Sequence, residues 1–333
     1  MERLQALRLW LGKQLGTESF DLAPASSDAS FRRYFRATFN GRHYIVMDAP
    51  PAHEDCRPFV RVAGVFGEAG AHVPGVLAQD LEQGFLLLTD LGSSTYLSVL
   101  NEANAHELYL AANAALVKIQ LASKPGVLPE YDRALLAREL DLFPEWYVAR
   151  HLNAELTRAQ REILHGVFER VLASNLAQPR VFVHRDYHSR NLMVSDPNPG
   201  VLDFQDAVYG PITYDLASLY KDAYIRWDEE RVLDWTIRYW EAARKVRLPV
   251  SPDFYEFYRD FEWMGVQRHI KVLGIFARLY HRDGKDGYLK DMPLVMDYLR
   301  RACERYTELA PMARLLDELE NRQAQKPALW HWI

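Results

Sequence analysis

The fold is indicated most strongly by one stretch of the sequence, His184-Arg185-Asp186-Tyr187-His188-Ser189-Arg190-Asn191. A second cluster, Asp203-Phe204, belongs with it, and Asp203 follows Asn191 by twelve residues. The apolar run Val181-Phe182-Val183 precedes the first cluster, and Val201-Leu202 precedes the second. Both runs are rich in β-forming residues, so each polar cluster is expected at the end of a strand, facing a cleft. Asp186, Asn191 and Asp203 should therefore converge on one small volume.

The first cluster matches the pattern H-R-D-x-x-x-x-N of the protein-kinase catalytic loop. In that pattern the Asp accepts the proton of the attacking hydroxyl, while the Asn and a later Asp hold Mg²⁺ against the triphosphate. The chain repeats the first three letters at His281-Arg282-Asp283, but Tyr288 stands five residues after that Asp and cannot bind magnesium. The second copy is expected to be a solvated turn beside Gly284 and Gly287.

Composition limits the kind of protein this chain can be. Its 333 residues are 49% hydrophobic, enough for a large core, and its net charge of −5 gives no reason to expect nucleic acid or an anionic membrane. The partner should therefore be a small molecule. Cys56 and Cys303 lack metal-ligand spacing, and the sequence shows neither the apolar core of a signal peptide nor an apolar run of about 20 residues. A cytoplasmic monomer is expected.

Local patterns predict an α+β fold of two lobes. Leu4, Leu7 and Leu11 recur at helical spacing before Gly16, and Asn40-Gly41 separates two strand-like runs as a hairpin turn would. A helix at 54–70 and strands near 73–77 and 85–89 complete a small N-terminal lobe, residues 1–90. The larger lobe, residues 91–333, should be mostly helical, with periodic runs at 104–122, 133–150, 157–176, 228–247, 253–280 and 289–307.

Four further motifs carry a resemblance that covers nearly the whole chain. They are Ser27-Asp28-Ala29-Ser30-Phe31-Arg32-Arg33-Tyr34-Phe35-Arg36, Leu88-Thr89-Asp90-Leu91-Gly92, Leu202-Asp203-Phe204-Gln205-Asp206-Ala207 and Gly265-Val266-Gln267-Arg268-His269-Ile270-Lys271. The chain looks like the aminoglycoside phosphotransferase-type branch of the protein-kinase-like fold, with a small β-rich N-lobe and a large helical C-lobe. Within that branch it resembles the bacterial N-acetylmuramate/N-acetylglucosamine anomeric kinases. The resemblance implies ATP- and Mg²⁺-dependent phosphorylation of the C1 hydroxyl of these amino sugars to the 1-phosphate, in the peptidoglycan recycling that leads to UDP-N-acetylmuramate.

The resemblance assigns roles within the catalytic loop. Asp186 is the implied base, and Asn191 and Asp203 are the implied magnesium ligands, as suits a cation that prefers oxygen donors. His184 should serve the loop structurally, through a hydrogen bond to backbone. His188 should either contact the substrate or orient Asp186.

Two more aspartates lie near this loop in the sequence. Asp215 follows Gly210-Pro211 at a predicted helix start, where it should cap backbone N–H groups or pin the catalytic loop. Asp206 should reach the metal or the sugar, with a structural role as the alternative.

The nucleotide half departs from the usual kinase pattern, because it has no G-x-G-x-x-G loop. A Ser-rich turn before a strand should cradle the phosphates instead, unless it is an ordinary turn, through Ser27, Asp28 and Ser30. Met47 stands where a phosphate-binding Lys is expected, so Arg32 or Arg33 should supply the charge. Adenine is expected against a hinge made by Leu88, Asp90 and Leu91.

Charge helps to choose the acceptor. N-acetylmuramate carries a carboxylate that calls for a cation, whereas a site for polycationic aminoglycosides should be rich in carboxylates. Arg268 is the expected anchor, with His269 and Lys271 in the same helical turn, although three basic residues on a helix more often form a solvated face. The other expected sugar contacts, each with a core or structural alternative, are His188, Asp206, Tyr209, Glu139 and Trp146.

Two rival functions remain open at this point. One is another small-molecule kinase of the same fold, acting on an aminoglycoside, choline, homoserine or thiamine-like alcohol. The other is a non-catalytic nucleotide-binding module, suggested by the missing Lys and Gly-rich loop. The intact Asp186, Asn191 and Asp203 argue against the second, because a binding module needs no base.

Overall fold

The computed structural model describes residues 2–27 and 31–324, and the chain separates into two units. The first unit comprises Met1–Ala122 and Arg190–Ala207, and the second comprises Ser123–Ser189 and Val208–Ile333. The predicted lobes met at residue 90, so the segments 91–122 and 190–207 group differently from that expectation. No helix in the described part of the chain is long and apolar enough to cross a bilayer.

The first unit is built on an antiparallel sheet of five strands in the order β1-β2-β3-β5-β4. The strands are β1 (Asp21–Ser27), β2 (Arg33–Phe39), β3 (Arg42–Asp48), β4 (Val76–Asp80) and β5 (Phe85–Thr89). The predicted hairpin is confirmed between β2 and β3. Asn40 and Gly41 form its turn with φ of 48° and 71°, the left-handed conformation that this residue pair tolerates.

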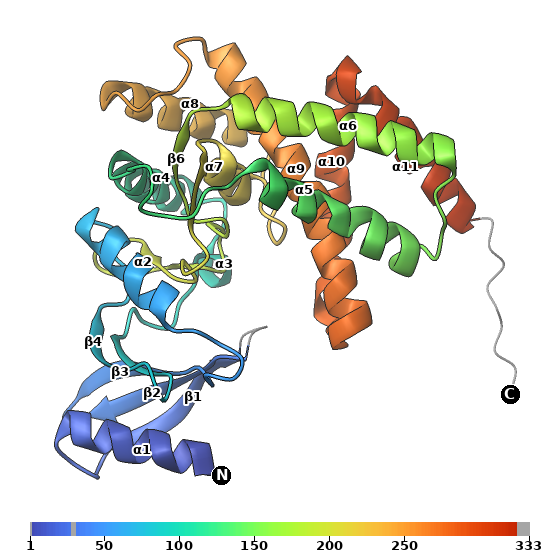
Figure 1. Ribbon diagram of the computed structural model, residues 1–333. Helices are drawn as coiled ribbons and strands as arrows, with labels where there is room; N and C mark the ends of the chain where they lie inside the picture. The colour runs from blue at the N-terminus through green and yellow to red at the C-terminus, as the bar shows by residue number, and fades with distance from the viewer. Residues whose placement is uncertain (1, 28–30, 325–333) are drawn as a thin grey trace, which may run out of the picture. The chain divides into compact units, whose positions relative to one another are not determined.

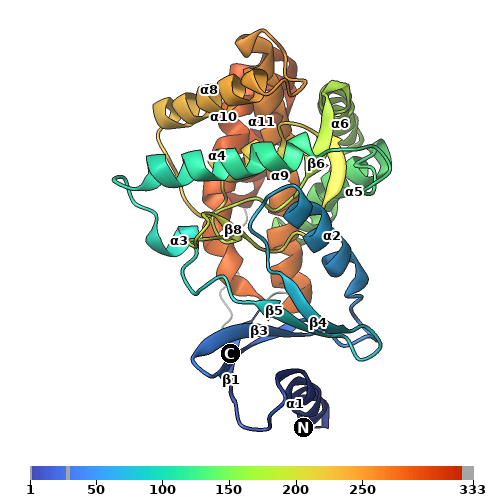
Figure 2. The same ribbon diagram turned by 90° about the vertical axis from the view of Figure 1, so that its left-hand side faces the viewer.

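Two helices lie on opposite sides of this sheet (Figures 1 and 2). The predicted opening helix is confirmed as α1 (Glu2–Leu15), and Gly16 follows it with φ of 67°. Leu7 and Leu11 of α1 pack on Val46 and other alternating side chains of the sheet, which makes one hydrophobic core. The second helix is α2 (Arg57–Glu68).

The first residues of the predicted Ser-rich turn, Ser26 and Ser27, belong to a strand. Strand β1 extends to Ser27, which pairs with Arg33, and the ladder has a bulge between Pro24 and Ser26. Pairing with β2 therefore makes this end of the segment a strand. Asp28 and Ser30 lie outside the described residues.

The rest of the first unit consists of short strands and two helices. These are α3 (Tyr96–Val99), α4 (Ala105–Leu121), β7 (Leu192–Met193) and β8 (Gly200–Val201). Strands β7 and β8 pair antiparallel, so the segments around Asn191 and Asp203 lie at one end of a small ribbon. Both polar clusters of the opening motif thus flank strands, as predicted.

The second unit is mostly helical and centres on α9, which contacts α5, η1, α6, α7, α8 and α10 (Figure 1). Its helices are α5 (Arg133–Leu142), the π-helix η1 (Phe143–His151), α6 (Arg158–Ala177), α7 (Tyr214–Tyr220), α8 (Glu229–Lys245), α9 (Phe254–Asp283), the 3₁₀ helix η2 (Asp286–Asp291), α10 (Met292–Arg305), the 3₁₀ helix η3 (Thr307–Leu309) and α11 (Ala310–Ala324). A two-stranded ribbon, β6 (Arg180–Val183) with β9 (Val208–Pro211), leads into and out of the catalytic segment.

Three features of the second unit differ from the sequence-based expectation. The predicted helix at 133–150 changes to a π-helix after Leu142, since Pro144 has no N–H to continue the α-helical bonds. The helix start predicted near Asp215 is confirmed as that of α7, but the extent of this helix was not predicted, because all seven of its residues are buried and the amphipathic pattern is lost. His281-Arg282-Asp283 is the last turn of α9, ended by Gly284 with φ of 67°, rather than a turn of its own.

Candidate active site

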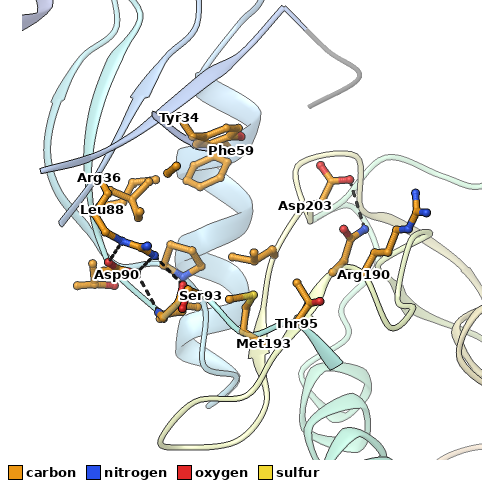
Figure 3. A pocket seen from close by; sticks show the side chains of 18 residues that line it. Tyr34, Arg36, Phe59, Leu88, Asp90, Ser93, Thr95, Arg190, Met193 and Asp203 are labelled. Carbon is orange, nitrogen blue, oxygen red and sulfur yellow. Dashed lines mark hydrogen bonds and ion pairs between the residues drawn. The ribbon is translucent and has the colours of Figure 1, made fainter. Parts of the chain in front are cut away.

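A cavity of about 440 Å³ lies in the first unit, on the face of the sheet opposite α1 (Figure 3). Figure 3 shows Arg36 and Asp90 at one end of it, and Arg190 and Asp203 at the other. The lining is mainly apolar with a few charged groups: Ala25, Tyr34, Arg36, Ile45, Phe59, Pro74, Leu88, Thr89, Asp90, Leu91, Gly92, Ser93, Thr95, Arg190, Asn191, Met193, Leu202 and Asp203. Such a mixture is typical of small-molecule sites.

The strand register explains which arginine reaches this cavity. Tyr34 and Arg36 are two residues apart on β2, so both side chains emerge on one face, where Arg36 lies opposite Ile45. Arg33 is an odd number of residues from both, so its side chain lies on the opposite face of β2. There it forms an ion pair with Asp48, a buried carboxylate at the end of β3. The alternation of β2 would have identified Arg36, which the sequence analysis did not assign to the site.

Arg32 does not itself line the cavity: it pairs with a carboxylate outside the lining and also interacts with Tyr34, which belongs to the lining. Arg32 Nε donates to Glu54 Oε2 at 3.2 Å, and the neighbouring Phe31 N–H donates to Glu54 Oε1 at 3.3 Å. Met47, at the position of the missing Lys, is fully buried in β3. A phosphate-binding role for Arg32 or Arg33 therefore stays a prediction, while Arg36 and Arg190 are the arginines that line the cavity.

A clamp fixes the predicted hinge at one end of the cavity. Arg36 donates through Nε to Asp90 Oδ2 at 2.6 Å and through Nη2 to Asp90 Oδ1 at 3.0 Å and the Gly92 carbonyl at 2.8 Å. Asp90 Oδ1 also accepts from the Gly92 N–H at 2.9 Å. Because both Asp90 oxygens are engaged, this side chain holds the hinge backbone in shape, and the cavity walls beside it are Leu88 and Leu91.

The two predicted magnesium ligands lie together at the other end. Asn191 Nδ2 lies 3.4 Å from Asp203 Oδ2, the Leu202 N–H donates to the Asn191 carbonyl, and Gln205 Nε2 donates to Asp203 Oδ1 at 2.8 Å. Across residues 2–27 and 31–324 there is no cluster of three or more His, Cys, Asp or Glu side chains suited to a metal. The donor set fits Mg²⁺, which commonly takes one or two protein oxygens and completes its shell with phosphates and water. Asp206 is exposed and does not line the cavity.

In the second unit, Asp215 pins the backbone before the predicted base. Asp215 Oδ2 accepts from the His184 N–H at 2.7 Å, and Oδ1 accepts from the Arg185 N–H at 3.0 Å. His184 is fully buried, and its Nδ1 accepts from the Asp186 N–H at 3.2 Å. Burial raises the pKa of Asp215 to about 7, although both N–H donors act in the opposite direction. The His188 N–H donates to the Asp186 carbonyl, and its ring meets Tyr224 edge-on.

Asp186 sits among cations. Its side chain is 42% exposed, and Arg268 Nη1 lies 3.6 Å from Asp186 Oδ1. Partial burial acts to raise the pKa of Asp186, but Lys271, Arg268, His188 and Arg185 outweigh it and hold the pKa well below the usual range for Asp. Its carboxylate is therefore ionised at neutral pH and able to accept a proton.

The predicted acceptor residues divide into buried and partly exposed groups. Arg268 and Lys271 are buried on α9, so the solvated-face alternative is wrong for them. Glu139 is also buried and contacts Lys271 and Arg185. Trp146, within η1, and Tyr209 are half-buried. The Arg180 guanidinium lies over the Tyr209 ring, 5.2 Å from its centre.

Comparisons with known proteins agree with this chemistry. Residues 21–250 match the model of the phosphotransferase enzyme family. The chain is 54% identical to the N-acetylmuramate/N-acetylglucosamine kinase of Pseudomonas aeruginosa, over 95% of this chain and 97% of that protein. It is 52% identical to the protein of the same name from Neisseria meningitidis, over 96% of each.

A solved structure supports the fold independently. The ADP-bound structure of an aminoglycoside phosphotransferase superposes with a TM-score of 0.56 at 15% identity, covering 88% of this chain and 97% of that one. The predicted α+β kinase-like fold, with an antiparallel N-terminal sheet and a mostly helical remainder, is thereby confirmed. The chain belongs to the phosphotransferase enzyme family.

Proposed function

We propose that this phosphotransferase is a sugar kinase that transfers the terminal phosphate of ATP to the C1 hydroxyl of N-acetylmuramate and N-acetylglucosamine, within peptidoglycan recycling. The observation that carries the substrate is the identity of 54% to a kinase named for these two amino sugars, over 97% of that protein. The catalytic-loop pattern and its ionised Asp186 support the reaction type.

Asp186 is the proposed base. As the anomeric oxygen attacks the terminal phosphorus of ATP, a new P–O bond forms, the bond from that phosphorus to the bridging oxygen breaks, and ADP leaves. The hydroxyl proton passes to the Asp186 carboxylate. An anomeric hydroxyl is more acidic than an ordinary alcohol, so a carboxylate is a sufficient base.

Nucleotide binding is assigned to the cavity of the first unit. Its apolar walls suit the adenine ring, and the backbone at Leu88 and Leu91 offers the polar groups that read the edge of a base. Asn191 and Asp203 would hold Mg²⁺, which when bound neutralises charge that develops on the phosphates. Arg190 lines the same end of the cavity and is a further candidate for phosphate contact.

The test is phosphorus NMR of the product after incubation of the purified protein with Mg-ATP and N-acetylmuramate. A 1-phosphate signal coupled to the anomeric proton is expected. A 6-phosphate would keep the kinase and reject the anomeric assignment. No product with either amino sugar, but turnover of another alcohol, would reject the proposed substrate.

A further inference from the structure

The carboxylate of Glu139 lies at the centre of a buried polar cluster in the second unit. The residue is 5% exposed, and its Oε1 lies 2.9 Å from Lys271 Nζ and contacts the Arg185 guanidinium. Its Oε2 accepts from Gln267 Nε2 at 3.0 Å and from the Tyr131 hydroxyl. Both oxygens are thus engaged by protein donors, which accounts for Glu139 without a sugar hydroxyl.

This cluster contacts Arg185, the residue that immediately precedes the proposed base. Arg185, which Glu139 holds by its guanidinium, immediately precedes Asp186 and has a φ of 78°, a conformation that costs energy for a non-glycine residue. Arg268 Nη1 donates to the Arg185 carbonyl at 2.9 Å, and Asp215 accepts from its N–H. Every polar group of the Arg185 backbone is therefore held by a side chain from a helix.

Lys271 connects the cluster to a second support. Its Nζ donates to the Tyr214 hydroxyl at 3.0 Å and lies 5.6 Å from the centre of that ring. Arg268 stacks over the same ring at 5.6 Å. Tyr214 is the first residue of α7 and precedes Asp215. Its ring therefore contacts Arg268 and Lys271 of α9 and belongs to the same helix as the aspartate that holds the catalytic loop.

We propose that Glu139 and Lys271 form a positioning pair for Asp186, in which Glu139 fixes Arg185 and Lys271, and Lys271 with Arg268 keeps the base ionised and oriented. This inference rests on the proposed function, because it takes Asp186 as the base. It distinguishes two basic residues on one helix turn: Arg268 lies 3.6 Å from Asp186 and also donates to the Arg185 carbonyl, whereas Lys271 pairs with Glu139 and adds positive charge near Asp186.

Charged groups surround Asp186, so the pH dependence of kcat/KM tests the proposed positioning pair. The groups that face it are Arg185 and His188 from its own loop, Asp215 from α7, and Arg268 and Lys271 from α9. Among the cations, Lys271 has the largest lowering effect on the pKa of Asp186. Removal of this charge should raise that pKa, so the acid limb of the kcat/KM profile should move to higher pH.

The experiment compares four variants of the full chain: Lys271→Met, Glu139→Gln, the double variant, and Lys245→Met as a matched control at the exposed end of α8. For Lys271→Met we expect the acid limb to move upward by about one pH unit and kcat to fall about tenfold, with the KM for ATP within about twofold of wild type. Glu139→Gln leaves the buried Lys271 and the half-buried Arg185 without their counterion and should lower the melting temperature most. Lys245→Met should match wild type throughout.

The double variant distinguishes positioning from a purely structural role. It removes one charge of each sign, so its melting temperature should recover relative to Glu139→Gln, while its acid limb stays shifted as in Lys271→Met. Recovery of the wild-type pH profile along with stability would overturn the proposal, as would a wild-type profile and kcat in Lys271→Met. Failure of the assigned base would instead appear as full turnover in Asp186→Asn, and failure of the proposed function as the absence of a sugar 1-phosphate product from wild-type protein.

Discussion

Two residues of the catalytic segments adopt backbone conformations that L-amino acids avoid. Arg185 and Asp203 have φ of 78° and 62°, and each such residue costs on the order of 1–3 kcal/mol. Each is held by side-chain hydrogen bonds: Asp215 accepts from the Arg185 N–H, and Gln205 donates to the Asp203 carboxylate. The backbone strain thus lies at one proposed magnesium ligand, Asp203, and at Arg185, the residue that precedes the proposed base.

The role of Asp186 leads to a kinetic prediction. Asp186→Asn removes the proton acceptor with little change in volume, so kcat should fall by about 10²- to 10⁴-fold. The dissociation constant for ATP should stay near wild type, because the nucleotide cavity is lined by other residues. Steady-state kinetics and calorimetric titration with ATP measure the two quantities, and substantial residual turnover would remove Asp186 from its assigned role.

Arg36 leads to a binding prediction. Arg36→Ala breaks the clamp on Asp90 and Gly92, so the hinge backbone should lose its fixed geometry and the KM for ATP should rise by about tenfold, the effect of about 1.4 kcal/mol. Arg42→Ala, at an exposed position of the neighbouring strand, is the matched control. Equal ATP KM values in the two variants would show that the clamp does not shape the nucleotide site.

At the scale of elements, α9 is the helix on which the second unit is organised. It presents Arg268 to the catalytic segment and Gln267 and Lys271 to Glu139 of α5, and it passes very close to the end of α5 at Gly274. A Cβ at Gly274 would lie 2.5 Å from the backbone carbon of Leu142. A glycine is therefore required here by a close approach of two helices, even though its own conformation is helical.

This close approach predicts a stability difference between two glycines. Gly274→Ala should force the two helices apart and destabilise the protein by about 1–3 kcal/mol. Gly166→Ala in α6, where a Cβ would meet nothing within 4 Å, should stabilise it by about 0.5–1 kcal/mol, since alanine loses less backbone entropy in a helix. Denaturant unfolding of both variants checks the sign of each change, and a neutral Gly274→Ala would contradict the tight packing.

At the scale of the whole molecule, buried charges make stability depend on pH. Burial acts to raise the pKa of Glu139, but Lys271 and Arg185 outweigh it and lower the pKa from 4.5 to about 2. Between these values the unfolded chain binds more protons than the folded one. The contribution of Glu139 is therefore complete above pH 4.5 and is lost as the pH falls toward 2.

The corresponding prediction concerns acid unfolding. Wild type should lose about 3 kcal/mol more unfolding free energy than the Glu139→Gln, Lys271→Met double variant when the pH falls from about 5 to about 2. Urea titrations at a series of pH values measure this difference. Parallel pH dependences in the two proteins would show that Glu139 does not titrate with the lowered pKa.

Elements with local sequence signals could be predicted without the three-dimensional structure. The opening helix, the Asn40-Gly41 hairpin and the long helices followed from periodicity and turn chemistry, because those patterns depend on neighbours within one or two turns. The motifs around Asp186 and Asp203 indicated the family by their resemblance alone. The sequence indicated where helix α7 begins, near Asp215, but not how far it extends, because complete burial removes the amphipathic pattern of a surface helix.

Which charged side chains belong to the site depends on contacts between segments that are distant in the sequence. Arg33 and Arg36 are three residues apart and chemically identical, yet the strand register pairs one with Asp48 and directs the other into the cavity. Glu139 and Lys271 lie far apart in sequence and meet in a buried ion pair. Packing between distant segments determines which buried charges form ion pairs with one another. Local sequence patterns therefore cannot predict these partners.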